Sequence, residues 1–176
     1  VATTVLASAG IIAVVITYFS QNLVRDAING LLILLTDRYA VGDVILVDDV
    51  GGFVERMNLY MTQLRSADGE YITIPNGSIT VVRNLTKDWS RVNFTIEVAY
   101  DADIKRALQV LRQVAEEFYA DPDWRDHLVE PVEVLGVDEV SHAGMLVRIW
   151  LKTQPLKQWL VGRGFRLRVK EAFDRE

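Results

Sequence analysis

The side chains that could carry out acid–base or metal chemistry are few and scattered along this chain. The two histidines, His127 and His142, have no second histidine, cysteine or acidic partner at the spacing that holds a metal ion. Asp48-Asp49 could bind a cation, but its place before Gly51-Gly52 favours a solvated turn. Five carboxylates gather near the end of a predicted helix, where a solvated face is the simpler interpretation: Glu116, Glu117, Asp121, Asp123 and Asp126.

Short catalytic motifs are absent from the sequence as well. It contains no phosphate-binding loop, dinucleotide fingerprint, nucleophile elbow or HExxH pair. Without cysteine it can form neither a disulfide nor a thiolate metal site. The formal net charge of −5 argues against a general nucleic-acid binder, which needs a basic surface to neutralise phosphates. We therefore expect no enzyme, no cofactor, no bound metal and no nucleic-acid partner.

The N-terminal segment has a different character. Residues 1–19 contain no charged side chain, and the first one is Arg25. A helix of this length spans roughly 28 Å at 1.5 Å per residue, close to the thickness of a bilayer core. A signal peptide would need a basic start, a shorter apolar run and a cleavage site. A buried core helix is rarely uncharged over such a length. The segment is predicted to cross a membrane.

Small residues recur at every fourth position of this helix, with Gly10 beside them: Ala9, Ala13 and Thr17. Such a stripe lets the backbones of neighbouring helices approach closely in lipid, where van der Waals packing drives association. We expect this stripe to face another copy of the same helix.

The helix changes character at Ser20-Gln21-Asn22. Beyond this point polar and apolar residues take different faces: Asn22, Arg25, Asp26 and Asn29 against Leu23, Ala27, Leu31 and Leu34. An amphipathic helix of this kind suits a membrane surface or a domain below it, so a bend is predicted near Gln21 and Asn22. Gly30 costs about 1 kcal/mol relative to Ala inside a helix. It marks either a close helix–helix contact or a second flexible point.

Two small folded parts are predicted after residue 40. Residues 41–90 form short alternating runs with turn signals at Gly51-Gly52, Asp68-Gly69 and Asn76-Gly77, which indicate a small, strongly bent β domain. Residues 91–176 follow the order strand, helix, strand, strand, helix. This order predicts an incomplete ferredoxin-like α+β domain that lacks its final strand.

Four runs of sequence together resemble one family of membrane channels: residues 21–35, 39–43, 65–79 and 98–104. Through them the chain resembles the small-conductance mechanosensitive (MscS-like) channels. The match has no gaps through the first helix and the β domain, and it is looser toward the C-terminus. No single run is specific to this family, but the four runs in combination are.

The resemblance implies a fold and an assembly. Residues 1–40 would be a pore-lining transmembrane helix with an amphipathic extension, residues 41–90 a Sm-like β domain and residues 91–176 a cytoplasmic α/β domain. The partners would be identical subunits in a homo-heptamer, the lipid bilayer, and permeating ions and small solutes. The channel would lie in the bacterial inner membrane and open under tension, releasing solutes on hypo-osmotic shock. The full subunit would be longer than this chain at both ends.

The resemblance also assigns roles to residues of the first helix. Val14 and Tyr18 fall where the family has two apolar constriction rings, and Gly10 and Ala13 match its helix-packing stripe. Tyr18 differs from the family by its hydroxyl group, and a place at the helix–lipid boundary is the alternative for it.

The same resemblance places the hinge at Gln21-Asn22, although Asn22 stands where a glycine is common, and it makes Gly30 a second flexible point.

Two rival functions remain. One is a membrane-tethered module whose Sm-like and ferredoxin-like parts bind RNA or protein. The other is a membrane enzyme, for which the sequence shows no titratable cluster.

Overall fold

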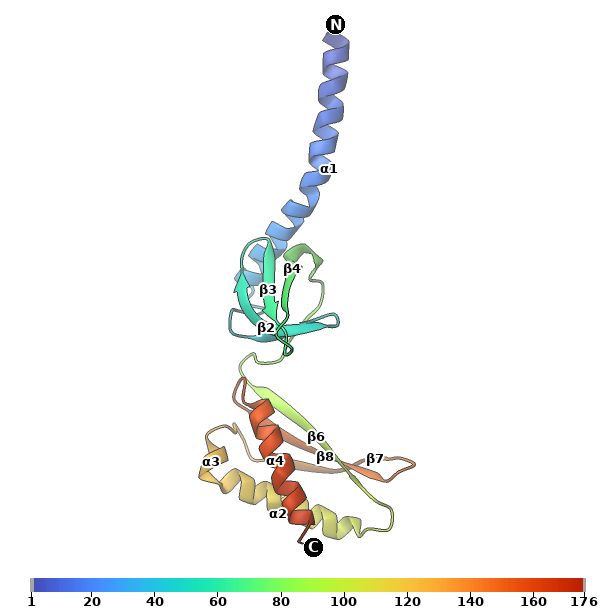
Figure 1. Cartoon of the computed structure of the whole chain (residues 1–176), viewed down its shortest axis with the longest axis vertical. Helices are drawn as coiled ribbons and strands as arrows, with labels where there is room; N and C mark the ends of the chain where they lie inside the picture. Colours follow the sequence, from blue (N-terminus) through green and yellow to red (C-terminus); the bar gives the residue numbers. More distant parts are fainter. Residues whose placement is uncertain (1, 176) are drawn as a thin grey trace. The chain divides into compact units, whose positions relative to one another are not determined.

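The computed structural model describes the backbone of residues 2–175 and the side chains of Thr17 and residues 20–175. The chain divides into two compact units, Val1–Leu85 and Thr86–Glu176. The first contains the N-terminal helix and a five-stranded sheet, and the second contains a three-stranded sheet with its helices (Figure 1). The first helix and the β domain thus form a single unit.

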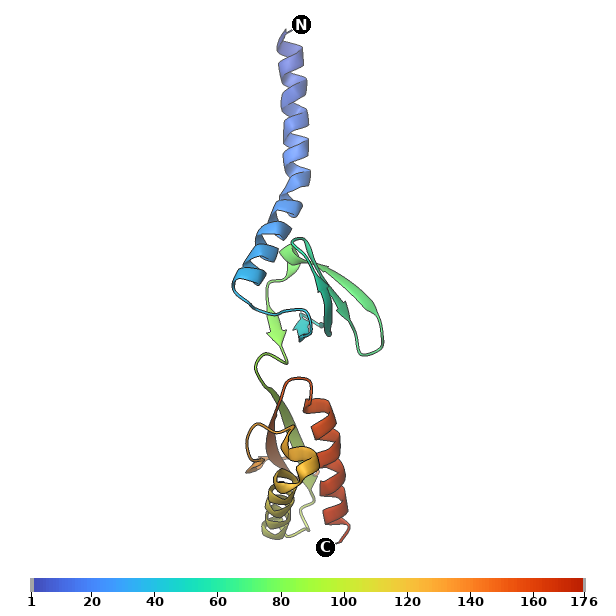
Figure 2. The ribbon, with the colours of Figure 1, turned by 90° about the vertical axis from the view of Figure 1, so that its left-hand side faces the viewer.

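The N-terminal helix α1 (Ala2–Leu35) is continuous. Its ribbon changes direction in its lower part instead of running straight (Figures 1 and 2). Among the described side chains, no helix combines the length and the apolar character needed to span a membrane. The uncharged segment predicted to cross the membrane lies almost wholly outside those side chains.

The sheet of the first unit is antiparallel throughout, in the order β4-β3-β2-β1-β5. Its strands are β1 (Val44–Val47), β2 (Val50–Met57), β3 (Met61–Arg65), β4 (Tyr71–Pro75) and β5 (Val82–Asn84). Alternate residues of β1 and β3 are buried, as expected for strands with one face on a core. The core also takes Ile33 from α1 and Tyr39 from the segment that follows it.

Two of the three predicted turns differ from the structure. Asp68-Gly69 forms the β3–β4 turn, with Gly69 at a φ of 86°, so this prediction is confirmed. Gly51-Gly52 lies inside β2, and the turn falls three residues earlier, at exposed Asp48-Asp49, where the sequence had favoured a solvated turn. Gly52 is required there because a Cβ atom would lie 2.5 Å from the backbone oxygen of Arg65. Asn76-Gly77 is not a hairpin turn, since it belongs to the short 3-10 helix η1 (Asn76–Ser78) and is buried.

The second unit has the predicted element order with one addition. Its sheet order is β6-β8-β7, antiparallel, formed by β6 (Ser90–Val98), β7 (Glu133–Val140) and β8 (Met145–Thr153). The helices are α2 (Ile104–Ala120), α4 (Gln158–Phe173) and the unpredicted one-turn helix α3 (Pro122–Arg125). The Asp103 side chain caps α2 by accepting hydrogen bonds from the backbone N–H groups of Lys105 and Arg106.

The core of this unit lies between one face of the sheet and the helices α2 and α4. Phe165 of α4 packs edge-on against Phe94 of β6 and Phe118 of α2, with ring centroids 5.5 Å and 5.3 Å apart. Phe118 also stacks on Trp124 at 4.9 Å. Gly164 leaves room for this indole, because a Cβ atom there would lie 2.2 Å from the Trp124 ring.

Candidate functional site

The lower part of α1 meets the β domain at Gly30. This residue is buried, and a Cβ atom on it would lie 2.0 Å from the backbone oxygen of Leu59 and 2.5 Å from Nδ2 of Asn76. One turn earlier, Oδ1 of Asp26 accepts a hydrogen bond of 2.7 Å from the backbone N–H of Gly77. Asn29 Nδ2 donates to the backbone oxygen of Asn76 at 3.3 Å. At Gly30 the helix therefore approaches the β domain too closely for any side chain.

Asn76 is the centre of this junction. It is fully buried, and its Nδ2 donates to the backbone oxygens of Asn58 (2.9 Å) and Leu59 (3.0 Å). Its Oδ1 accepts a hydrogen bond of 2.9 Å from the Thr62 hydroxyl. Every polar atom of the side chain thus has a partner. This matters because an unsatisfied buried donor or acceptor costs about 1–3 kcal/mol.

Tyr39 extends the network to the segment after α1. Because the single Thr62 hydrogen is given to Asn76, the Tyr39 hydroxyl is the donor in its 2.8 Å hydrogen bond to Thr62 Oγ1. Both side chains are buried, at 2% and 0% exposure. Burial raises the pKa of the Tyr39 hydroxyl, and the hydrogen bond to Thr62 opposes this only in part. The chain Tyr39–Thr62–Asn76 connects the end of α1, strand β3 and η1.

On the side of α1 that faces away from the β domain lies an apolar stripe, which we define as Val24, Ile28, Leu31 and Leu35. These residues follow the spacing i, i+4, i+7, i+11 and are between 49% and 73% exposed. Ile33, on the side of the β domain, is 1% exposed. The helix therefore places Asp26, Asn29, Gly30 and Ile33 on the domain, and the apolar stripe stays uncovered by the described part of the chain.

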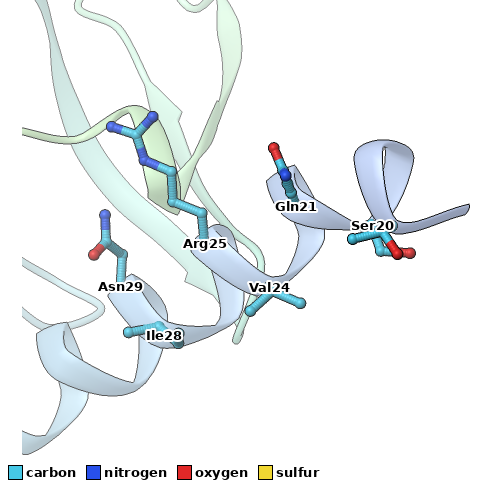
Figure 3. Close-up of a pocket in the computed structure, with 7 residues that line it drawn as sticks. Ser20, Gln21, Val24, Arg25, Ile28 and Asn29 are labelled. Atoms are coloured by element: carbon cyan, nitrogen blue, oxygen red, sulfur yellow. The ribbon is translucent and has the colours of Figure 1, made fainter. Parts of the chain in front are cut away.

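An open groove runs along α1 beside this stripe. Figure 3 shows Gln21, Arg25 and Asn29 pointing to the same side of the helix, as their spacing of four residues requires. Thr17 lines the same groove. Thr17 of the predicted helix-packing site and Gln21 of the predicted hinge thus lie on one surface of α1.

The other predicted site residues divide into two groups. Asn22 is exposed, and Gly30 is buried against the β domain instead of another helix. The proposed constriction and the rest of the packing stripe lie on α1, but their side chains are outside the described residues: Ala9, Gly10, Ala13, Val14 and Tyr18. These assignments stay predictions.

The sequence placed Asp26 and Asn29 on the polar face of the helix, but it did not identify their hydrogen bonds to the β domain or the part of Thr62 and Asn76 in the junction. Two signals were available. The first was the pair Asn29-Gly30, a polar residue and a glycine inside an otherwise apolar stretch. The second was the Asn-Gly pair directly after β4, which the turn signal led us to interpret as a hairpin. Within the described residues, no group of three His, Cys, Asp or Glu side chains could hold a metal ion.

Two family profiles match consecutive parts of this chain. The profile described as "Mechanosensitive ion channel, beta-domain" matches residues 22–87. The profile described as "Mechanosensitive ion channel MscS, C-terminal" matches residues 92–176. The first match therefore begins on α1 and includes the whole junction with the β domain.

Curated relatives agree with these profiles. The chain is 37% identical over 175 residues to a small-conductance mechanosensitive channel of Caldanaerobacter subterraneus subsp. tengcongensis, covering 99% of this chain and 61% of the relative. It is 30% identical over 169 residues to the moderate conductance mechanosensitive channel YbiO of Escherichia coli, covering 96% of this chain and 23% of the relative. The chain thus spans less than two thirds of both relatives.

A solved structure shows the same fold. The crystal structure of Helicobacter pylori MscS in its closed state matches with a TM-score of 0.78 at 18% identity, covering 99% of this chain and 68% of the other. Both units thus have the architecture of an MscS-type protein. The chain belongs to the MscS-like family of mechanosensitive channels.

Proposed function

We propose that this chain is part of a channel subunit that opens under membrane tension and releases ions and small solutes on hypo-osmotic shock. The observation that carries the proposal is the orientation of α1. Asp26, Asn29 and Gly30 attach the helix to the β domain, while the apolar stripe faces away from it. A helix held in this way transfers any movement of its apolar face to the β domain.

The apolar stripe requires a cover of its own. Burying a Val, Leu or Ile side chain completely is worth about 1.5–3 kcal/mol. The four stripe residues are roughly half exposed, so covering them would contribute several kcal/mol in each subunit. Lipid acyl chains or a neighbouring α1 supply such a cover. A change of membrane tension would then act on the apolar stripe, because this stripe makes the apolar contacts with lipid or with the neighbouring helix.

Identical subunits complete the proposed channel. We propose a homo-heptamer in the bacterial inner membrane, with the β and α/β domains on the cytoplasmic side. A closed ring brings one copy of α1 from each subunit around a common axis, as rotational symmetry requires. In this ring Ala9, Gly10, Ala13 and Thr17 would form the contact between neighbouring helices.

The gate would lie on the same helix. Val14 and Tyr18 are one helical turn apart, so symmetric copies would form two stacked rings. An apolar ring sheds water and blocks ions in the closed state. Gln21 and Asn22 would provide the hinge between the membrane-crossing part and the part held on the β domain.

The test uses the full-length subunit in bacteria that lack their own mechanosensitive channels. We expect the parent protein to rescue survival of hypo-osmotic shock and to give tension-activated currents in patch-clamp recordings. Val14→Asp should hydrate the closed ring and give currents without tension. Tyr18→Ala should raise the resting conductance or lower the opening tension. Currents from the parent protein that do not respond to tension would contradict the proposal. A Tyr18→Ala channel that behaves like the parent would place Tyr18 at the lipid boundary.

A further inference from the structure

The β7–β8 hairpin carries exposed apolar side chains at one edge of the α/β unit. All residues from Val137 to Val140 are exposed, and these two valines are 43% and 64% exposed. Each valine lies opposite a residue of β8 that packs into the core, Val147 and Met145 respectively, so both lie on the helix side of the sheet. In Figure 1 the hairpin extends past the helices of the unit. The two valines therefore continue the apolar face of the sheet beyond the part that the helices cover.

The tip of this hairpin is fixed to the end of β6 and to the segment that follows it. The Tyr100 hydroxyl donates a hydrogen bond to the backbone oxygen of Ser141. Oγ of Ser141 accepts a hydrogen bond of 3.2 Å from the backbone N–H of Gly144. A Cβ atom at Gly144 would lie 2.5 Å from the backbone oxygen of Val98, so the turn lies directly against β6. The hairpin is thus ordered before it meets a partner, which lowers the entropic cost of a contact.

β7 is an edge strand that is poorly suited to pairing with a further strand. Its register with β8 is interrupted twice, between Val134 and Gly136 and between Val137 and Glu139. Irregularities of this kind twist an edge strand and prevent its backbone from adding another strand. A partner of the hairpin would therefore contact its side chains.

A second exposed surface lies on α4. This helix packs on β6 and β8, whereas β7 is the opposite edge strand of the sheet and contacts α2. We define the α4 surface as Leu160, Arg163 and Leu167, which have the spacing i, i+3, i+7 and so share one face of the helix. The two leucines are 43% and 60% exposed. The unit thus has two separate surfaces with exposed apolar side chains, on different sides.

These two surfaces lie in segments of opposite charge. Residues 133–144, which contain β7 and the turn, have three carboxylates and no lysine or arginine: Glu133, Asp138 and Glu139. Helix α4 has four basic residues against the single acidic residue Glu171: Arg163, Arg166, Arg168 and Lys170. The formal charges are therefore −3 and +3. Opposite charge beside apolar contacts selects one partner and one orientation.

We propose that the β7–β8 hairpin of one subunit docks on the α4 surface of a second copy of this chain. The partner is an identical subunit because the two complementary surfaces belong to the same unit. A contact between two different surfaces repeats from copy to copy, and it closes into a ring when the rotation permits. A contact between two hairpins would instead bring like charges together. The inference rests on the assembly of identical subunits proposed above and names the residues through which the α/β units meet.

The test places one new thiol on each surface of the full-length subunit. The chain described here has no cysteine, so the variant with both Val140→Cys and Leu160→Cys reports the contact directly. We expect a short bismaleimide to give a ladder of covalent dimers, trimers and larger species in denaturing gels. Either single variant can give at most a dimer, because each subunit then has one thiol. The matched control combines Val140→Cys with Glu116→Cys, an exposed position on α2, and should give no ladder.

Charge exchange tests the complementarity of the two surfaces. Adding Arg163→Glu to the variant with both thiols should lower the yield of the ladder about fivefold, because it places a carboxylate opposite the acidic hairpin. Adding Glu139→Lys as well should restore most of the yield. Labelling with a monofunctional maleimide would verify that the thiols react equally in all variants, and circular dichroism would verify that each variant is folded.

The mass of the untreated protein separates failure of this inference from failure of the assembly. Untreated oligomers that give no ladder would overturn the inference and leave the channel proposal intact. An untreated protein that is monomeric would contradict both. An equal ladder in the control pair would overturn the inference, because the contact would then not be specific to α4. No recovery on charge exchange would also overturn it.

Discussion

Substituting Gly30 by alanine tests the junction between α1 and the β domain most directly, because two physical effects act in opposite directions. Alanine is more favourable than glycine in a helix by about 1 kcal/mol. If Gly30 were only a flexible point of α1, the substitution would therefore stabilise the helix. At this position, however, the new Cβ atom would lie 2.0 Å from a backbone oxygen of Leu59. Real Cβ atoms essentially never come closer than 3.0 Å to such atoms. The helix must therefore move away from the β domain by about 1 Å.

A shift of this size would break the contacts on both sides of Gly30. The hydrogen bond from Gly77 to Asp26 is 2.7 Å long and that from Asn29 to Asn76 is 3.3 Å, so about 1 Å more takes both beyond useful range. Their loss costs about 0.5–1.5 kcal/mol for a neutral pair and about 1.5–3 kcal/mol where a charge takes part. The sum exceeds the gain in helix propensity. We expect Gly30→Ala to reduce the stability of the first unit by about 1–3 kcal/mol.

Thermal unfolding of the purified full-length protein measures this effect. A loss of 1 kcal/mol lowers the melting temperature by about 4–8 °C for a unit of this size. Ser20→Ala is the matched control, because it raises helix propensity in the same helix and adds no atom. If Gly30→Ala raised the melting temperature as Ser20→Ala should, the close approach would be refuted and Gly30 would act only as a flexible point.

Three further predictions concern the same junction. Asp26→Ala should destabilise it by about 1–3 kcal/mol because the Gly77 N–H loses its acceptor, whereas Asp26→Asn keeps an acceptor oxygen and should cost less in the same melting assay. Thr62→Val should cost about 1–3 kcal/mol in urea unfolding, because it leaves the buried oxygen of Asn76 without its donor; a change below 0.5 kcal/mol would show that the network adds nothing. Burial raises the pKa of the Tyr39 hydroxyl. The contribution of Tyr39 to stability should therefore be fully present below the ordinary tyrosine pKa of about 10. It should be lost as the pH rises through the raised pKa, because the hydroxyl ionises more readily in the unfolded chain. Tyr39→Phe should be about 1 kcal/mol less stable at neutral pH and should show a weaker alkaline loss, and an unchanged alkaline slope would contradict this assignment.

Local patterns in the sequence determined much of the architecture. The order of the strands and helices in the second unit followed from hydrophobic periodicity, and the turn at Asp68-Gly69 followed from local backbone chemistry. Each of these signals depends only on residues a few positions apart, so it can be recognised in the sequence before the fold is known. The family resemblance is likewise a property of sequence runs, and the profile matches confirm it.

Only the tertiary structure decided how distant segments meet. Asn76-Gly77 resembles a hairpin turn in the sequence, but it is buried under α1 because Asp26 and Asn29 supply partners for its backbone. Gly30 is required by an oxygen atom that lies 29 residues further along the chain, at Leu59. A close approach depends on the atoms on both sides, and a one-dimensional pattern contains only one side of each such contact.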